Sequence, residues 1–208
     1  MKLENIFYIN LESRKDRRVL VERELNELGW KYERFNAIKH SVGSIGCARS
    51  HMNVVMQAKE RDLDYVVVLE DDAEFLNKDF INNQIENILK SELEYDVLLL
   101  AGNIRDPIIK NEDIEGLNNI YQVKHSWTTT CYLVRKHYYD TLIDNFKEGL
   151  ELMTKTGDRR TYACDSWWIN LQKKDKWLII LPRTITQRSD YSDIEKKHVD
   201  YKHLLCDI

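Results

Sequence analysis

The sequence predicts an α/β protein in which a mainly parallel sheet is covered by helices on both faces. Three observations predict this class. Strand-like and helix-like segments alternate through residues 1–102 of the 208-residue chain. Residues 65–69 form a continuous, valine-rich apolar run, which is typical of a central strand buried on both sides. The acidic triplet Glu70, Asp71 and Asp72 follows directly, at the strand end where open α/β sheets bind ligands.

The first strand and helix are predicted from residue type and period. Residues 3–10 are apolar with β-branched and aromatic side chains, which favours a strand. Ser13 can cap a helix that carries Asp16 near its start, where a carboxylate is favourable. Gly29 follows at the point where a helix end is expected. The apolar face of this helix is formed by residues at helical spacing, namely Val21, Leu25 and Leu28.

The alternation continues to residue 101. Residues 32–38 are predicted to form a second strand, and the next helix is expected to begin near Gly46. Its apolar face is marked by Ile45, Ala48, Met52 and Val55. After the central strand, a further amphipathic helix is marked by Ile81, Ile85, Ile88 and Leu89. Residues 96–101 then form another buried strand.

The second half of the chain is less regular. A polar loop is expected to about residue 119, followed by short strands at residues 120–123 and 130–134. Helices are predicted near residues 137–152 and 165–173. Nothing in the middle of the chain resembles a linker, so we expect a single domain that spans residues 1–208. Its first half is interpreted as Rossmann-like and its second half as α+β.

Composition and charge exclude several classes of partner. Hydrophobic residues make up 43% of the chain and charged residues 32%, an ordinary globular balance. The net charge is only -4 with both signs interspersed, so no basic surface suggests nucleic acid or an anionic membrane. No run approaches the roughly 18 apolar residues of a membrane span, and no secretory signal precedes the first strand. We therefore expect no transmembrane segment and a cytoplasmic location.

The four cysteines, Cys47, Cys131, Cys164 and Cys206, are far apart in the sequence and form no CxxC pair. Their spacing predicts neither a zinc site nor a disulfide framework. Reduced thiols are the expected state.

The acidic triplet is the first candidate site. Three adjacent carboxylates repel one another, and a divalent cation relieves that repulsion. Clustered oxygen ligands with open water positions suit Mg²⁺ or Mn²⁺ better than zinc. Such an ion bridges a diphosphate and neutralises a leaving group. The alternative is that Glu70, Asp71 and Asp72 form only a solvated turn after a buried strand.

An ordered set of short motifs spans nearly the whole chain. In order, they are Tyr8-Ile9-Asn10-Leu11 with Arg14, Asp16 and Arg17; Arg34-Phe35 with Ala37; Gly46-Cys47-Ala48 with Ser50-His51; Leu69-Glu70-Asp71-Asp72; Thr128 to Leu133; Asp165; and Pro182 through Gln187 to Tyr191-Ser192-Asp193-Ile194. The set resembles glycosyltransferase family 25, which contains bacterial lipooligosaccharide galactosyltransferases and collagen hydroxylysine galactosyltransferases. Arg49 departs from the apolar residue that family members often carry, and the tail after Ile194 is short and charged.

The resemblance implies a GT-A-type fold, a UDP-sugar donor, a Mn²⁺ or Mg²⁺ ion and inversion at the anomeric carbon. Residues 1–102 then form the nucleotide-sugar-binding half, and residues 103–208 form the acceptor-side half. The acidic triplet takes the role of the family's DxD motif. The metal ligands implied by the match are Glu70, Asp72 and Asp193. The donor-binding residues implied by it are Asn10, Arg14, Arg17, Ser50, His51, Asp71 and Gln187.

Several of these residues also have structural alternatives. The two arginines after the first strand can contact phosphate or hold the acidic triplet, but a helix start with exposed charges is the simpler reading of residues 16–18. His51 can equally be a packed histidine that bonds to nearby backbone. Gln187 and Asp193 can have ordinary loop roles.

Inverting transfer needs a base that takes the proton of the acceptor hydroxyl. Asp165 is the candidate for this base. It opens a predicted helix that carries Trp167 and Trp168, and an aromatic ring beside a carboxylate suits the apolar face and the hydroxyls of a sugar. The alternative is a helix cap or first-turn acid beside core tryptophans.

The expected function is transfer of galactose or glucose to a hydroxyl of a glycan, lipooligosaccharide or hydroxylysine-type acceptor. Lipopolysaccharide biosynthesis and collagen glycosylation are the settings that the resemblance suggests. One alternative is a nucleotide-sugar-binding protein without transfer activity. Another is a hydrolase that uses the carboxylates or a metal ion. The acceptor is left open because the second half is loosely patterned.

Overall fold

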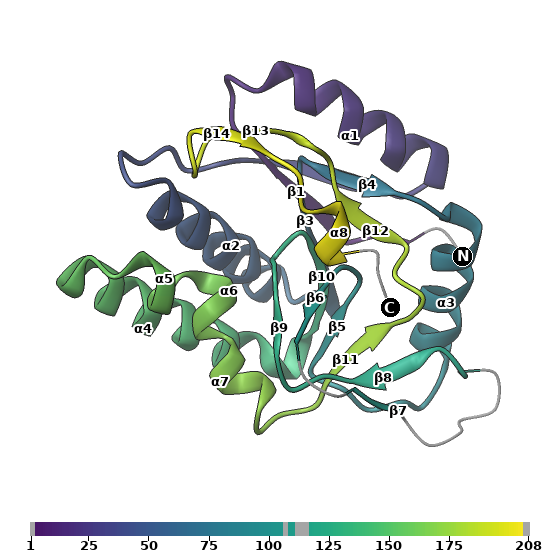
Figure 1. Ribbon diagram of the computed structural model, residues 1–208. Helices are drawn as coiled ribbons and strands as arrows, with labels where there is room; N and C mark the ends of the chain where they lie inside the picture. The colour runs from purple at the N-terminus through teal and green to yellow at the C-terminus, as the bar shows by residue number, and fades with distance from the viewer. Residues whose placement is uncertain (1–2, 106–107, 111–116, 206–208) are drawn as a thin grey trace.

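The computed structural model describes residues 3–105, 108–110 and 117–205. Within them, an eight-stranded sheet forms the centre of the molecule (Figure 1). From edge to edge its strands are β2 (Tyr32–Asn36), β1 (Ile6–Asn10), β3 (Tyr65–Glu70), β10 (Cys131–Arg135), β5 (Val97–Leu99), β11 (Trp177–Ile180), β8 (Ile120–Gln122) and β7 (Ile109–Lys110). Strands β10 and β8 run antiparallel to their neighbours, and the other six share one direction. The predicted α/β class is confirmed.

Both faces of β3 are buried, as its valine-rich sequence predicts. Val66 and Val68 belong to one hydrophobic core, and Val67 and Leu69 belong to the core on the opposite face. Each core is closed by two long helices: α2 (Gly43–Glu60) and α4 (Tyr139–Thr156) on the first face, and α1 (Lys15–Leu28) and α3 (Lys78–Lys90) on the second (Figure 1). The strand that carries the acidic triplet is therefore held rigidly from both sides.

The start of α1 differs from the prediction. Arg14, rather than Ser13, occupies the N-cap position, and no side chain caps the helix. The reason is a turn in which the Arg14 N–H donates to the Leu11 carbonyl at 2.9 Å, while the Asn10 side chain donates to the Arg14 carbonyl at 3.0 Å. The predicted helix end at Gly29 is confirmed, because this residue takes a left-handed conformation with φ of 71°.

The two halves of the sequence share one sheet. Strand β10 from the second half lies between β3 and β5, and β11 pairs with β5. Three small pairs complete the strands: β12 (Ile185–Gln187) with β4 (Ala73–Phe75), β13 (Asp190–Ser192) with β14 (Lys197–Val199), and β6 (Asn103–Ile104) with β9 (Ser126–Trp127). The pairing of β12 with β4 places Gln187 opposite Ala73, directly after the acidic triplet.

The remaining helices are short. They are the 3₁₀ turn η1 (Lys136–Tyr138), α5 (Arg159–Tyr162), α6 (Cys164–Trp167), α7 (Ile169–Gln172) and α8 (Lys202–Leu205). The single helix predicted for residues 165–173 is thus divided into α6 and α7 at Trp168. This residue is completely buried and its ring N–H donates to the Ser126 carbonyl at 3.1 Å, so it packs as a core side chain. None of the described helices is long and apolar enough to cross a membrane.

Candidate active site

The acidic triplet lies where parallel strands β1 and β3 end together. Ile9 of β1 is in register with Glu70 of β3, so the next residue of β1, Asn10, lies beside the turn that follows β3. Asn10 is 1% exposed, and its side-chain amide donates to the Asp71 carboxylate at 2.7 Å. The amide thereby orients Asp71 within a buried turn.

Arg17 holds two of the three carboxylates. This residue lies in the first turn of α1, and its guanidinium donates to Asp71 and to Asp72, each at 3.0 Å. It also donates to Asp190 at 2.9 Å and to the Tyr191 carbonyl at 2.9 Å. Of the two roles weighed for the arginines, this geometry matches the one that holds the acidic triplet. The same guanidinium ties β13 to α1.

Arg14 is also occupied by carboxylates. Its guanidinium donates to Asp193 at 2.8 Å and to Asp16 at 2.9 Å, and it forms a further ion pair with Asp190. Arg14 is 13% exposed, whereas Asp193 is 43% exposed. Asp193, which the resemblance implies as a metal ligand, is therefore paired with Arg14, which the resemblance implies as a donor contact.

Asp72 has the electrostatic environment of a cation ligand. One of its oxygens accepts hydrogen bonds from Arg17 and from the Gln187 amide, each at 3.0 Å. The other oxygen, Oδ1, is buried and has no hydrogen-bond partner among the residues that the structure describes. Burial and the nearby charge of Glu70 raise the pKa of Asp72 to about 7. A divalent cation would satisfy the free oxygen and offset the repulsion between the carboxylates, so these residues fit a bound metal ion.

Glu70 faces a different set of partners. Its Oε1 atom accepts a hydrogen bond from the Thr129 hydroxyl at 2.6 Å and lies 3.1 Å from His51 Nε2. The His51 ring is 1% exposed, and its Nδ1 atom lies 2.9 Å from the Tyr132 hydroxyl. Burial raises the pKa of Glu70, but the contacts with His51 and Thr129 outweigh this effect and lower it. His51 therefore contacts side chains rather than the backbone that its structural alternative invoked.

Ser50 connects α2 to the loop that precedes it. Its hydroxyl donates to the Gly46 carbonyl at 2.8 Å and accepts a hydrogen bond from the Ile38 N–H at 2.8 Å. A Cβ atom at Gly46 would lie only 2.4 Å from the Ile38 carbonyl oxygen, so a larger residue does not fit there. The two hydrogen bonds of Ser50 and the close approach at Gly46 fix this loop against α2, beside the acidic triplet.

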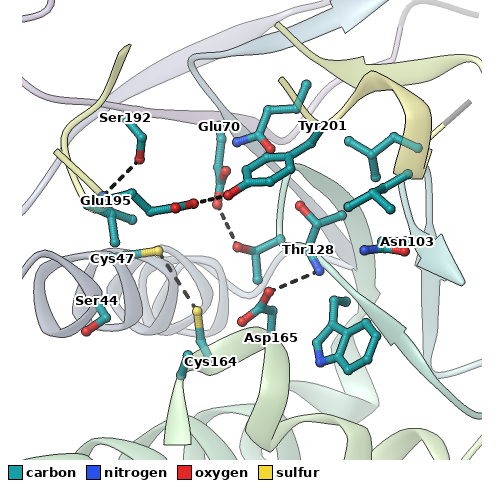
Figure 2. A pocket seen from close by; sticks show the side chains of 17 residues that line it. Ser44, Cys47, Glu70, Asn103, Thr128, Cys164, Asp165, Ser192, Glu195 and Tyr201 are labelled. Atoms are coloured by element: carbon teal, nitrogen blue, oxygen red, sulfur yellow. Dashed lines mark hydrogen bonds between the residues drawn. The ribbon is translucent and has the colours of Figure 1, made fainter. Parts of the chain in front are cut away.

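Two cavities meet at this site. The arginine cavity, of about 430 Å³, is lined by Arg14, Arg17, Lys39, His40 and the acidic triplet, among others. The tryptophan cavity, of about 330 Å³, is lined by Trp127, Thr128, Asp165 and Tyr201, among others (Figure 2). The two cavities share a wall formed by Cys47, Glu70, Gln187, Ser192 and Ile194. Of the predicted site residues, Asp165 lines the tryptophan cavity but not the arginine cavity.

Asp165 lies in the first turn of α6 and faces the tryptophan cavity (Figure 2). Its carboxylate accepts a hydrogen bond from the Thr128 N–H at 3.2 Å. Thr128 has a φ of 77°, a left-handed conformation that threonine rarely adopts, so the backbone here is strained. Burial raises the pKa of Asp165. This carboxyl is therefore a better proton acceptor than an exposed aspartate.

The predicted sugar-facing role of Trp167 and Trp168 is wrong. Trp168 is buried in the core, and the Trp167 ring N–H donates to Glu148 on α4 at 3.1 Å. Neither residue lines either of the two cavities described above. The aromatic residue that lines the cavity of Asp165 is Trp127, which is brought there by β9.

A sequence comparison identifies the family. The sequence model of the family described as "Glycosyltransferase family 25 (LPS biosynthesis protein)" matches residues 39–168, which is more than half of the chain. The chain belongs to glycosyltransferase family 25. The matched part includes the acidic triplet, His51 and Asp165.

Family 25 relatives are recognisable across about two thirds of the chain. A procollagen galactosyltransferase 1-B from Xenopus laevis is 25% identical over 166 residues, covering 64% of this chain and 27% of the relative. A glycosyltransferase 25 family member from Drosophila melanogaster is 26% identical over 164 residues, covering 64% of this chain and 26% of the relative. The chain thus spans about a quarter of the length of the curated relatives it matches.

Among solved structures, the chain is similar to a Drosophila β1,4-galactosyltransferase 7 in complex with manganese, UDP-Gal and xylobiose. That similarity has a TM-score of 0.46 and 9% identity, and it covers 97% of this chain and 73% of the other. At this level of similarity, the fold assignment rests on the strand order of the family 25 chain itself.

Besides Trp127, sequence reasoning missed Cys47, Cys164 and Asp190 of this family 25 site. Cys47 and Cys164 are 117 positions apart, yet their sulfur atoms are 3.9 Å from each other. The position of Cys47, four residues before His51 on a predicted helix, was a usable signal because such residues share one face. Asp190, which contacts both Arg14 and Arg17, directly precedes the Tyr191-Ser192-Asp193-Ile194 motif but has no signal of its own.

Proposed function

We propose that this chain is a metal-dependent, inverting hexosyltransferase that moves a hexose from a UDP-sugar to an acceptor hydroxyl. The observation that carries the proposal is the meeting of two cavities at Glu70 and Gln187. A transferase must hold two substrates so that they react at one point. The arginine cavity suits the donor and the tryptophan cavity suits the acceptor.

The arginine cavity has the chemistry that a nucleoside diphosphate requires. Its lining includes the cationic side chains of Lys39 and Lys196, which complement phosphate charge. Asp72 and Glu70 are the proposed ligands of a Mn²⁺ or Mg²⁺ ion, with Asp193 at the rim of the same cavity. When bound, such an ion supplies the positive charge that neutralises the diphosphate leaving group.

Arg14 and Arg17 are proposed to hold the carboxylates around the donor site in place. We call these two arginines and the carboxylates that they contact the charged frame. Because both guanidinium groups already contact carboxylates, they position ligands rather than bind phosphate directly. Asn10 orients Asp71, and Gln187 orients Asp72 through its 3.0 Å hydrogen bond. Ser50 and His51 form the wall that α2 presents to this cavity.

Asp165 is the proposed base in the tryptophan cavity. In the transfer step the acceptor oxygen forms a bond to the anomeric carbon, and the bond from that carbon to the UDP oxygen breaks. The proton of the acceptor hydroxyl passes to the Asp165 carboxylate, whose raised pKa favours this transfer. The Trp127 ring offers an apolar surface for the acceptor sugar in the same cavity.

Galactose is the first donor sugar to test. Curated relatives carry the name procollagen galactosyltransferase, and the family description names lipopolysaccharide biosynthesis. A hydroxylysine-type acceptor and a lipooligosaccharide sugar therefore both belong in the acceptor panel, and UDP-glucose belongs beside UDP-galactose.

The proposal is tested by thermal shift and UDP release with UDP-galactose, UDP-glucose and UDP-N-acetylglucosamine, with and without Mn²⁺. We expect one donor to stabilise the protein and to turn over only with the metal. Asp72→Ala should abolish both effects, whereas Asp79→Asn, at an exposed position in the first turn of α3, should retain both. Stabilisation without turnover across the acceptor panel would replace the proposal with a binding protein. Cleavage of a glycan without a nucleotide donor would replace it with a hydrolase.

A further inference from the structure

A second group of possible metal ligands lies on the shared wall of the two cavities. Cys47 and His51 are one helical turn apart on α2, so their side chains lie on the same face of the helix. Glu70 reaches the same point from the end of β3. Cys47 Sγ, a His51 ring nitrogen and a Glu70 carboxylate oxygen all lie within 4.8 Å of one another. We infer that Cys47, His51 and Glu70 form a binding site for a thiophilic divalent cation such as Zn²⁺.

The donor types favour zinc over manganese. A thiolate, an imidazole and a carboxylate are typical zinc ligands, and three protein ligands leave one position open. Manganese and magnesium prefer sites made of oxygen atoms, such as the acidic triplet. The cluster with a sulfur donor therefore differs in donor type from the proposed site of the donor's metal ion, and Glu70 is a proposed ligand at both sites.

The His51 ring is already oriented for this role. Its Nε2 atom faces Glu70 at 3.1 Å, while its Nδ1 atom lies 2.9 Å from the Tyr132 hydroxyl. A hydrogen bond at Nδ1 leaves Nε2 available to the ion and fixes the ring, which is the usual arrangement of a histidine that binds a metal. The Tyr132 hydroxyl can accept a hydrogen bond from the Nδ1–H group, because a hydroxyl is both a donor and an acceptor.

The Cys47 sulfur contacts the Cys164 sulfur in a hydrogen bond, and it is not held in a disulfide bond. Its distance of 3.9 Å from Cys164 Sγ is far longer than the roughly 2.05 Å of a disulfide bond, and both residues are free cysteines. Figure 2 shows the two sulfur atoms side by side at the wall of the tryptophan cavity. Cys47 and Glu70 line both cavities, so an ion can reach the cluster from either one.

The test uses Co²⁺ as a spectroscopic substitute for Zn²⁺ on the metal-free full chain. A cobalt ion bound to a thiolate absorbs in the near ultraviolet through sulfur-to-metal charge transfer. We expect one equivalent of Co²⁺ to produce this absorption, and we expect Zn²⁺, but not Mn²⁺, to remove it. The readout is cobalt binding at the Cys47 thiolate, so a failure of this test can be told apart from a failure of the transfer assay.

Cys47→Ser should abolish the absorption. Cys131→Ser is the matched control, because Cys131 is a buried thiol outside the cluster, and this variant should retain the absorption. A second measurement needs no variant: Zn²⁺, but not Ca²⁺, should slow alkylation of Cys47 in the wild-type chain, as located by peptide mass spectrometry. The inference is overturned if the absorption is absent, if it survives in Cys47→Ser, or if Mn²⁺ displaces cobalt as readily as Zn²⁺ does.

Discussion

The arginine cavity and the tryptophan cavity are each lined by an aspartate with a raised pKa, but the hydrogen-bond donors around the two aspartates differ. Burial raises the pKa of both Asp72 and Asp165. Asp72 is surrounded by side chains with charge, namely Arg17 and Glu70, and by the Gln187 amide. The hydrogen bond resolved for the Asp165 carboxylate comes from a backbone N–H, that of Thr128.

This difference separates two kinds of chemistry. A carboxylate inside a network of charges is held in place and is suited to binding a cation. A partly buried carboxylate that accepts hydrogen bonds from backbone N–H groups is suited to accepting a proton. Under the proposed function, the same residue type therefore serves two roles because its neighbours differ.

The largest effect that tests this comparison is expected on the tryptophan side. Asp165→Asn removes the proposed proton acceptor, so the turnover rate should fall by roughly 10² to 10⁴ fold. Thermal stabilisation by UDP with Mn²⁺ should be unchanged, because the donor side is intact. UDP release and thermal shift measure the two quantities on the same sample.

Asp144→Asn is the control for Asp165→Asn. Asp144 is an exposed carboxylate on α4 that pairs with Lys147, and its loss should leave turnover unchanged. Wild-type turnover in Asp165→Asn would show that another group accepts the proton.

The next effect concerns the charged frame of the arginine cavity. Arg17→Met leaves Asp71 and Asp72 buried without their shared cation, so the free energy of unfolding should fall by about 3–5 kcal/mol. Arg18→Met is the matched control, because the adjacent Arg18 is 46% exposed and pairs with Glu22 along the helix. Its unfolding free energy should change little. Urea denaturation compares the two variants, and equal losses would contradict the proposed role of Arg17.

The smallest effect is expected from Asp190 and depends on pH. Burial raises the pKa of Asp190, but hydrogen bonds from Arg17, the Tyr191 N–H and Arg14 outweigh it and lower the pKa to about 2. A carboxyl with a lowered folded-state pKa stabilises the fold above its unfolded pKa, near 4, and loses this contribution as the pH falls towards 2. Asp190→Asn should therefore cost about 1 kcal/mol at pH 6 and almost nothing at pH 2.

Urea denaturation of wild type and Asp190→Asn between pH 2 and pH 6 measures this difference. A gap that stays constant over the whole range would mean that Asp190 stabilises the fold through packing rather than through its charge.

The first half of the fold was predictable because its signals are local. The period of Val21, Leu25 and Leu28 indicates α1, and Gly29 marks its end. The valine-rich run before Glu70 indicates a strand that is buried on both faces. The helix start was misplaced by one residue, because the turn from Leu11 to Arg14 depends on a hydrogen bond from Asn10 at the end of β1.

The second half was less predictable because its order depends on distant partners. The residues of β10 do not indicate that this strand lies between β3 and β5. The tryptophans beside Asp165 were misassigned for the same reason. Whether Trp168 or Trp127 lines a cavity depends on packing against elements elsewhere in the chain.

The sequence by itself determined the α/β class, the position of the acidic triplet at a strand end and the resemblance to family 25. These properties follow from residue order and short-range periodicity, which can be read within a single segment of the chain. Only the tertiary structure decided which partner each carboxylate has. Arg17 forms an ion pair with Asp190, and Cys47 lies near Glu70, because β-strand pairing and helix packing bring segments that are distant in the sequence to one point. Electrostatic effects depend on these distances, and so the chemistry of the site is a property of the fold.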